Sequence, residues 1–249
     1  MYEYDEQFYQ YINEGSARSA RLVVPALLEL LPQTVESVLD VGCGAGAWLV
    51  VWKEHGCRVK GLDGDYVDRN LLMIEAKEFF AQDLQKGFDL TEKFDIAQCL
   101  EVAEHLPEPH SATLVACLCR HADIVLFSAA APGQGGENHI NEQSYAYWRD
   151  LFAINGYQMY DPLRGRLVSD TQVLPWYRYN TFVYVNNNKL PDTHAALSAY
   201  RIDPSVHPQD VSPFWYQMRK AIVRLLPVPL MTLLAIIKKT LANLPLRFK

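Results

Sequence analysis

Two kinds of apolar pattern alternate along most of the chain. Short apolar runs predict strands buried on both faces, and between them apolar residues recur at the 3.6-residue spacing of helices. From residue 17 to residue 156 the alternation predicts a parallel sheet with helices on both of its faces. The predicted helices cover 17–31, 45–55, 110–121 and 144–155, a helix or turn covers 67–77, and the strands cover 37–42, 58–63, 78–83, 93–103, 122–130, 158–163 and 181–186.

The pattern changes after residue 186. Residues 187–213 are rich in Asn, Asp and Pro and predict a linker, and residues 214–249 are apolar and basic. A chain of 249 residues suits one large domain with an appendage. We therefore predict a domain over 1–186, a linker over 187–213 and a basic amphipathic extension over 214–249.

Charge separates the extension from the domain. Seven of the 23 basic residues and none of the 29 acidic residues follow Asp210, so the remainder of the chain carries a net charge of −13. Such an acidic body argues against nucleic acid as a partner, because tracking phosphates needs clustered Lys and Arg.

The extension itself permits two interpretations. Its least polar run, 225–237, is too short to span a bilayer. Flanking basic residues and the aromatic Phe214, Trp215 and Tyr216 are typical of a segment lying on a membrane surface. The alternative is a pair of helices packed on the domain or on a partner subunit.

Cysteine usage bears on the compartment. The five cysteines are odd in number, include no C-x-x-C pair, and several lie in apolar runs, which indicates reduced packing residues. The first eleven residues are acidic and aromatic, unlike a secretory signal. We expect a cytoplasmic protein, peripheral on the inner face of the membrane if the extension binds lipid. The sequence does not determine the oligomeric state.

Three glycines alternate directly after the first strand, in VLDVGCGAGAW. A glycine-rich turn lets a ligand approach the backbone at the start of the next helix. The third glycine comes one residue too early for the G-x-G-x-x-G dinucleotide fingerprint. L-D-V-G-C-G instead closely resembles motif I of the class I S-adenosylmethionine (SAM) methyltransferases. The resemblance implies that Asp40 and the turn from Gly42 to Gly46 contact the methionine part of SAM.

Two further acids lie at the ends of the next two strands, where the resemblance expects them. Asp63 ends the second strand, where a carboxylate can accept hydrogen bonds from ribose hydroxyls. Asp83 ends the third strand, where family members bind the adenine amino group. Gly64 occupies a position that often packs on adenine, so Asp65 or Tyr66 takes part of that role. The cofactor-binding set implied by the resemblance is Asp40, Gly42, Cys43, Gly44, Gly46, Asp63, Gly64, Asp65, Asp83, Leu84 and Leu100.

The resemblance covers about residues 16–186. It implies an α/β, Rossmann-like class I methyltransferase fold: a mostly parallel seven-stranded sheet with helices on both faces, followed here by a C-terminal helical extension.

An acid and histidine cluster, E-x-x-E-H, follows the fourth strand as Glu101, Glu104 and His105. Ligand sites in this architecture lie at the carboxyl edge of the sheet. The pattern resembles the small-RNA 2′-O-methyltransferases and the ubiquinone-pathway O-methyltransferases, which place a magnesium-type ion there. Both also carry a later histidine, matched here by His139. This resemblance implies Glu101, Glu104, His105 and His139 as ligands of a divalent Mg, Mn, Fe or Zn ion.

The same cluster permits a reading without metal. His105 or His139 then acts as a general base, with Glu104 as its acidic neighbour, or the residues have only structural roles. A base or a metal favours a hydroxyl acceptor, because the hydroxyl has to lose its proton.

We expect a SAM-dependent O-methyltransferase that acts on a small molecule or a saccharide. Residues 176–180, WYRYN, either line a sugar-binding cleft or form a strand edge that packs on the core. Two alternatives stay open: an RNA 2′-O-methyltransferase, which the acidic body disfavours, and a non-catalytic SAM-binding or scaffold protein.

Overall fold

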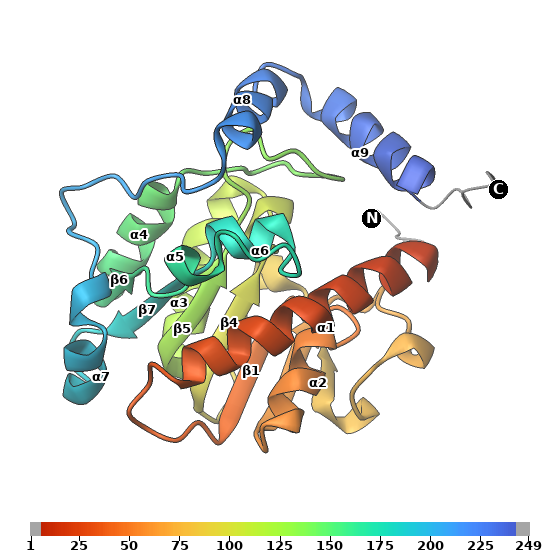
Figure 1. The fold of residues 1–249 in the computed structure, drawn as a ribbon. Helices are drawn as coiled ribbons and strands as arrows, with labels where there is room; N and C mark the ends of the chain where they lie inside the picture. Colours follow the sequence, from red (N-terminus) through yellow and green to blue (C-terminus); the bar gives the residue numbers. More distant parts are fainter. Residues whose placement is uncertain (1–5, 243–249) are drawn as a thin grey trace.

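Seven strands form one sheet in the order β3-β2-β1-β4-β5-β7-β6 in the computed structural model, which describes residues 6–242 and the side chains of 13–237 (Figure 1). The first five strands run parallel, and β7 is antiparallel to both β5 and β6. This confirms the predicted fold class. The strands are β1 (Ser37–Val41), β2 (Arg58–Asp63), β3 (Phe79–Ala81), β4 (Phe94–Leu100), β5 (Ala122–Ser128), β6 (Tyr157–Tyr160) and β7 (Phe182–Asn186).

Helices cover both faces of the sheet, as the alternation predicts (Figure 1). Two 3₁₀ turns, Arg69–Leu71 and Ala76–Glu78, occupy the region predicted as a helix or turn. The α-helices are α1 (Glu6–Leu28), α2 (Ala47–Glu54), α3 (Ser111–His121), α4 (Tyr145–Ile154), α5 (Arg164–Leu167), α6 (Pro175–Asn180), α7 (Pro191–Ala196), α8 (Phe214–Val223) and α9 (Val228–Ala242).

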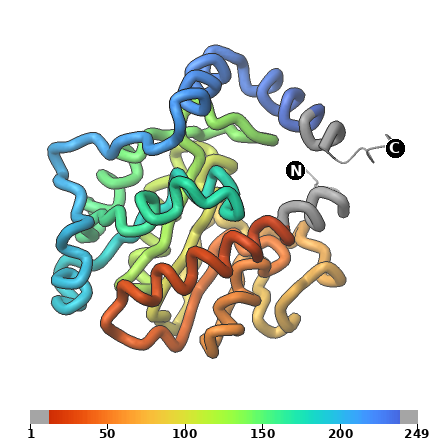
Figure 2. Tube along the Cα trace, viewed as in Figure 1, coloured from red at the N-terminus to blue at the C-terminus, as the bar shows by residue number. Residues whose placement is uncertain are grey.

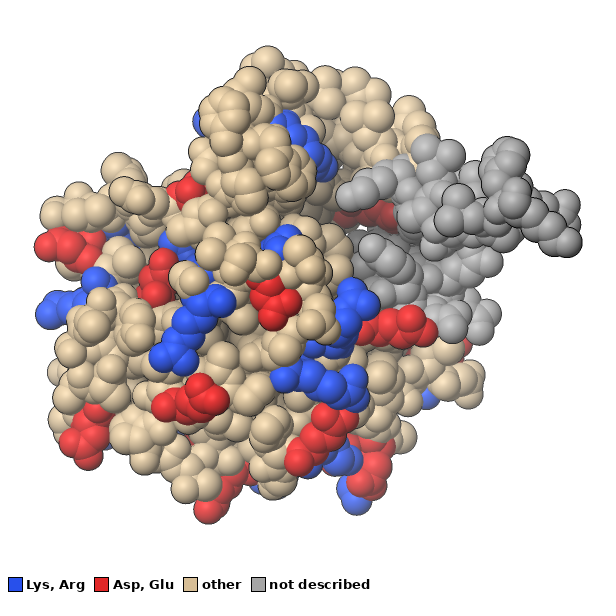
Figure 3. Space-filling model, in the orientation of Figure 1, with Lys and Arg blue, Asp and Glu red and all other residues tan. Residues whose placement is uncertain are grey.

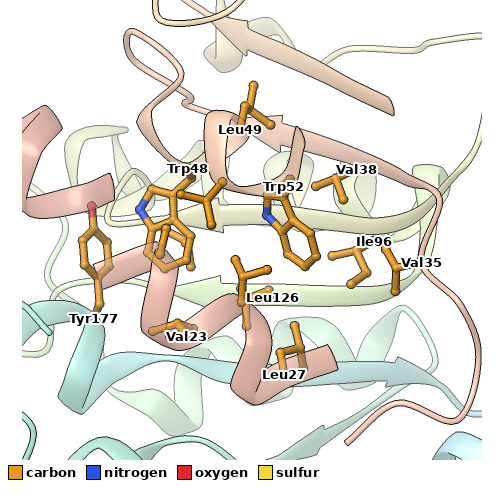
Figure 4. Close-up of a cluster of buried hydrophobic side chains, with 14 of the residues drawn as sticks. Val23, Leu27, Val35, Val38, Trp48, Leu49, Trp52, Ile96, Leu126 and Tyr177 are labelled. Atoms are coloured by element: carbon orange, nitrogen blue, oxygen red, sulfur yellow. The ribbon is translucent and has the colours of Figure 1, made fainter. Parts of the chain in front are cut away.

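The strands contribute alternate residues to two cores. Val38 and Ile96 face α1 and α2, where Trp48 and Trp52 fill the space over the sheet (Figure 4). The next residue along β1, Leu39, faces the core under α3 and α4. Successive side chains of a strand point to opposite faces, so a strand buried on both sides is apolar throughout. Each such side chain contributes about 1.5–3 kcal/mol by its burial.

The predicted elements differ from the structure most clearly at three places. Helix α1 begins at Glu6, well before residue 17. The fourth strand was predicted to reach residue 103 but ends at Leu100, because Glu101 adopts a left-handed φ of 57°. The strand-edge reading of 176–180 is wrong: these residues belong to helix α6, which Pro175 begins in the position where proline suits a helix.

The segment predicted as a linker has structure of its own. Residues 187–213 contain α7 and the 3₁₀ turn Ser198–Tyr200, and Leu197 is buried in the core beside α1 and α2. Ile202 N–H donates to the Met159 carbonyl, which holds the segment along the edge of the sheet.

The predicted C-terminal helical extension is present as α8 and α9. Figure 2 shows the chain crossing from α7 to α8, beyond the end of the sheet, and continuing into α9. No helix within residues 6–242 is long and apolar enough to cross a bilayer. Residues 1–12 and the basic Lys238, Lys239, Arg247 and Lys249, on which two of the sequence interpretations partly rest, lie outside the described side chains.

Candidate active site

The glycine turn follows β1, beside β4, where the strand order reverses. Gly42 and Gly44 have φ values of 83° and 53°, which favour glycine. A Cβ on Gly42 would come within 2.3 Å of the Val102 side chain, whereas one on Gly44 would meet nothing within 4 Å. Gly42 is thus needed for close packing, and the backbone at Gly44 stays open to a ligand.

Asp63 connects the end of β2 to this turn. Its Oδ2 accepts the Gly44 N–H at 2.7 Å, and its Oδ1 accepts the Gly64 N–H and the Tyr66 hydroxyl at 2.6 Å each. Burial raises the pKa of the Asp63 carboxyl, and these three hydrogen bonds oppose the shift. The carboxylate thereby fixes the position of the glycine turn.

Asp40 lies at the same edge and is only 3% exposed. Burial raises the pKa of its carboxyl to about 7, and the nearby charge of Asp63 adds to the shift. Two buried acids beneath an open backbone turn form a site that attracts a cationic group.

The other residues of the predicted cofactor set differ in exposure. Asp65 is exposed and pairs with Arg69 at 2.8 Å, while Asp83 is exposed and accepts the Gln85 N–H. Two kinds of position complete the set: buried side chains at Cys43, Leu84 and Leu100, and glycine backbone at Gly46 and Gly64.

Backbone contacts bring the second cluster together. The N–H groups of Ile140 and Asn141 both donate to the Glu104 carbonyl, at 2.9 and 3.0 Å. The loop after β5 is thereby fixed beside the residues that follow β4. One donor atom each from Glu104, His105 and His139 lies within 4.8 Å of the other two.

The two imidazoles of this cluster face each other edge to face, with ring centroids 4.9 Å apart. His105 Nδ1 lies 3.2 Å from the Asn138 carbonyl oxygen, and His139 Nδ1 lies 2.9 Å from Glu142 Oε1. Since both partners are acceptors, we assign the proton to Nδ1 of each ring, which leaves Nε2 with a lone pair. Burial and the neighbouring His139 lower the pKa of His105 to about 3, so this ring is neutral.

Glu104 is fully buried, and neither carboxylate oxygen has a hydrogen-bond partner. Burial and the neighbouring Glu101 carboxyl raise the pKa of the Glu104 carboxyl well above its usual range, and the nearby backbone N–H groups of Glu104 and Ala130 only partly oppose the shift. A buried carboxylate without donors is costly, so it takes up a proton or binds a cation. Together with two imidazole lone pairs, Glu104 makes a donor set that fits a divalent cation.

The structure does not bring Glu101, the fourth predicted ligand, into this group. Its carboxylate accepts Gln134 Nε2 at 2.6 Å and Asn180 Nδ2 at 3.2 Å. Asn180 Nδ2 also donates to Gln134 Oε1 at 2.7 Å, which closes a small polar network. The Glu101 carboxylate is thus occupied by side-chain amides.

The sequence analysis missed Glu142, which organises the loop carrying His139. Its two carboxylate oxygens accept the N–H groups of Gly133 and Gly135, each at 2.7 Å, in addition to His139. Glu142 stands three residues after His139 in HINEQ. An acid three residues after a histidine, shortly after two glycines, was the sequence signal that could have identified it.

Burial of two aromatic side chains in 176–180 goes against the interpretation that these residues line a sugar-binding cleft. Tyr177 and Tyr179 are buried, and Tyr177 packs edge to face on Trp48 with its hydroxyl 2.9 Å from Ser16 Oγ. Asn180 belongs to the network with Glu101. Tyr177 and Tyr179 are therefore core residues, whereas Trp176 is part-buried against the core.

Comparison of the sequence with known proteins gives a matching family model and several partial relatives. A family model described as a methyltransferase domain matches residues 13–162. The ubiquinone biosynthesis O-methyltransferase of Pseudomonas fluorescens strain SBW25 is 31% identical over 131 residues, which cover 49% of this chain and 50% of that protein. The ubiquinone biosynthesis O-methyltransferase of Glaesserella parasuis is 36% identical over 87 residues, which cover 30% of this chain and 37% of that protein. The chain spans about half, or less, of the length of these curated relatives.

Solved structures share the fold. The sugar N-methyltransferase KedS8 from Streptoalloteichus superposes on 75% of this chain and 94% of its own with a TM-score of 0.58 and 18% identity. A SAM-bound amino pentose methyltransferase from Micromonospora echinaspora covers 75% of this chain and 99% of its own, with a TM-score of 0.54 and 18% identity. At these identities the likeness concerns the fold.

Proposed function

We propose that this chain, which belongs to the methyltransferase domain family and is a SAM-dependent methyltransferase, methylates a hydroxyl oxygen of a small molecule or saccharide. The observation that carries the proposal is the buried Glu104 carboxylate beside two imidazole lone pairs, close to the glycine turn in the fold. A hydroxyl acceptor needs such a group because it must lose a proton, whereas a thiolate is already deprotonated.

SAM fits the glycine turn. The open backbone at Gly44 admits a ligand, and the two acids provide the charge and hydrogen-bond acceptors that an ammonium group and ribose hydroxyls require. We assign Asp40 to the methionine ammonium and Asp63 to the ribose. When bound, SAM supplies a methyl group on a positively charged sulfur. The chain's own contribution is to orient the acceptor in line with that methyl and to exclude water.

His139 is the better placed of the two imidazoles to take the proton. Glu142 holds its Nδ1–H, which leaves the lone pair on Nε2, and Nε2 lies against Gly136, where only a glycine leaves room for it. The low pKa of His105 makes that ring a weak base. Base assistance by a positioned histidine contributes roughly 10²–10⁴-fold to a rate.

Alternatively, Glu104, His105 and His139 would hold a divalent cation in the same place, in which case the His139 lone pair binds the ion and His139 is not the base. The unpaired carboxylate supports this, and the two nitrogen donors suit Zn²⁺, Fe²⁺ or Mn²⁺ better than Mg²⁺. The cation would supply positive charge beside the acceptor hydroxyl and so ease loss of its proton. Glu101 would stay in its amide network.

The acceptor class rests on the relatives and on charge. Curated relatives over part of this chain are named ubiquinone biosynthesis O-methyltransferases, and two structural neighbours act on sugars by their names. An RNA acceptor is less favoured, because the chain up to Asp210 carries a net charge of −13.

The test measures methyl transfer from labelled SAM to a panel of phenols and saccharides. Metal is stripped with a chelator, metal content is determined, and Mg²⁺, Mn²⁺, Fe²⁺ and Zn²⁺ are added back singly. His139→Ala is compared with His55→Ala, which changes an exposed histidine at the end of α2. We expect chelation to abolish transfer while SAM still binds, and one ion to restore it.

Two other outcomes are decisive. If activity is full after complete chelation and His139→Ala is still inactive, a role for metal is excluded and His139 is the base. Transfer to amines but to no hydroxyl in the panel overturns O-methylation.

A further inference from the structure

Helices α8 and α9 expose an unusual amount of apolar surface. Ten of the sixteen exposed large apolar side chains among the described residues lie between 214 and 237. Figure 3 shows the surface over α8 to be mostly uncharged in that view, in contrast with the mixed charges of the domain below it. The ten are Phe214, Trp215, Met218, Ile222, Leu225, Val228, Leu230, Leu233, Leu234 and Ile237.

Helix α8 is held in one orientation by its opposite face. Tyr216 packs on Tyr179 with ring centroids 5.3 Å apart, and Arg219 donates to the Gln134 carbonyl at 2.8 Å. Lys220 is buried and bonds Asp210. These contacts fix the helix on the domain. Its apolar face, on the opposite side, therefore points outward.

The orientation of α8 changes the charge assignment made from sequence. Arg219 and Lys220 are engaged with the domain, so they are not part of the outward face. Arg224 is exposed on α8's end. No acidic residue follows Asp210, and four more basic residues follow position 237. Among the described residues, the outward face thus combines apolar side chains with the exposed Arg224 and no acidic residue.

We propose that the outward face of α8 and α9 docks on an anionic lipid surface. Trp215 and Phe214 are the residue types that lie at the boundary between headgroups and acyl chains, and Leu225 is 84% exposed. No helix among the described residues is long and apolar enough to cross a bilayer, and the proposal places the segment in the membrane surface. Each basic residue near an anionic surface adds to the attraction, and the acidic domain is repelled from it, which orients the molecule.

Charge also argues against a second copy as the occupant. A two-fold symmetric contact through this face would bring Arg224 of both chains to the same interface, in a segment whose sequence adds four more basic residues. With no acidic residue after Asp210, the extension offers nothing to neutralise them. An anionic membrane supplies the missing countercharge.

The experiment is sedimentation of the full chain with vesicles of phosphatidylcholine alone or with 30% phosphatidylglycerol, a composition chosen for the assay. Trp215→Glu combined with Leu225→Glu is compared with Ile154→Glu, which changes an equally exposed apolar residue (82%) at the end of α4. We expect the double variant to lose at least about tenfold in vesicle affinity and Ile154→Glu to bind normally.

Charge is tested separately. Arg224→Gln should weaken binding to the anionic vesicles by roughly fivefold, and the exposed Lys189→Gln should not. Failure of the wild-type chain to bind anionic vesicles at low salt overturns the proposal. So does equal binding by the double variant and Ile154→Glu. Dimerisation in analytical ultracentrifugation that the double variant abolishes, without vesicle binding, assigns the face to a second copy instead.

Discussion

The buried carboxyl groups near the site differ in how many hydrogen-bond donors they receive. Asp63 receives three hydrogen-bond donors and Glu101 receives two side-chain amides, whereas Glu104 receives none. An unsatisfied buried acid destabilises the fold unless a proton or cation joins it. We infer that Glu101 holds its surroundings in place, that Asp63 holds the glycine turn in place for the ribose it is proposed to bind, and that Glu104 is kept available for a ligand.

The raised pKa of Asp40 predicts that SAM binding depends on pH. In the ligand-free protein the carboxyl is largely neutral below its pKa of about 7, and the SAM ammonium favours the ionised form. Affinity should therefore rise by roughly eightfold from pH 6 to pH 7.5 and then level off. Calorimetry at several pH values measures this. Asp40→Asn should bind SAM weakly and without that pH dependence; a flat wild-type profile contradicts the assignment.

Glu142→Gln should separate catalysis from cofactor binding. The amide cannot accept both glycine N–H groups and the His139 proton, so the imidazole loses its orientation. We expect kcat to fall about 10–100-fold, as for other residues that orient a histidine, with the Kd for SAM unchanged. Glu108→Gln, an exposed change nearby in the fold, is the control. Equal losses in kcat and in SAM binding would point to a structural defect instead.

At the scale of elements, the glycine-rich loop after β5 joins the C-terminal helices to the site. Gly133 lies directly against α8, where an added Cβ would come within 2.1 Å of the Lys220 carbonyl oxygen. The same loop donates the Gly133 N–H to Glu142, which holds His139. Packing of α8 and orientation of the histidine therefore depend on one stretch of backbone.

Gly133→Ala should loosen α8, and Gly56→Ala provides a matched control. Both glycines have a positive φ, 85° and 83°, so both changes carry a similar backbone strain of about 1–2 kcal/mol. Only Gly133 adds a clash with backbone; Gly56 faces open space. We expect a larger fall in melting temperature and faster proteolysis within 214–249 for Gly133→Ala. Equal behaviour of the two variants would show that the contact with α8 contributes little.

At the scale of the whole molecule, the glycine turn and the histidine loop occupy one edge of the sheet but are held in place by different elements. The glycine turn depends on β1, β2 and the residues that follow β4. The histidine loop also depends on α8, through the Arg219 contact with Gln134. Cofactor binding and acceptor chemistry should therefore respond differently to loss of the C-terminal helices.

A chain ending at residue 213 should bind SAM with a Kd within about twofold of the full chain, because no described contact joins α8 to the glycine turn. Methyl transfer should fall at least about tenfold, since misplacing reacting groups by an ångström already costs more than that. Calorimetry and the transfer assay measure the two properties on the same preparation. Loss of SAM binding in a truncated chain that still unfolds cooperatively would contradict this division.

Local pattern by itself determined much of this protein. Strand and helix identity follows from the spacing of apolar residues, and all seven strands were found in this way. The L-D-V-G-C-G turn and the acid at Asp63 are likewise short-range features, as are His105 and His139 in their motifs. Each depends on neighbours within a few residues, which a sequence displays directly.

Tertiary structure alone decided which of these residues are free to act. Glu101 and Glu104 look alike in the sequence, but amides of Gln134 and Asn180, distant along the chain, occupy the first and leave the second unpaired. In the same way, contacts with the domain turn Arg219 and Lys220 inward. Burial and pairing are set by residues that only folding brings together, so no local pattern could distinguish them.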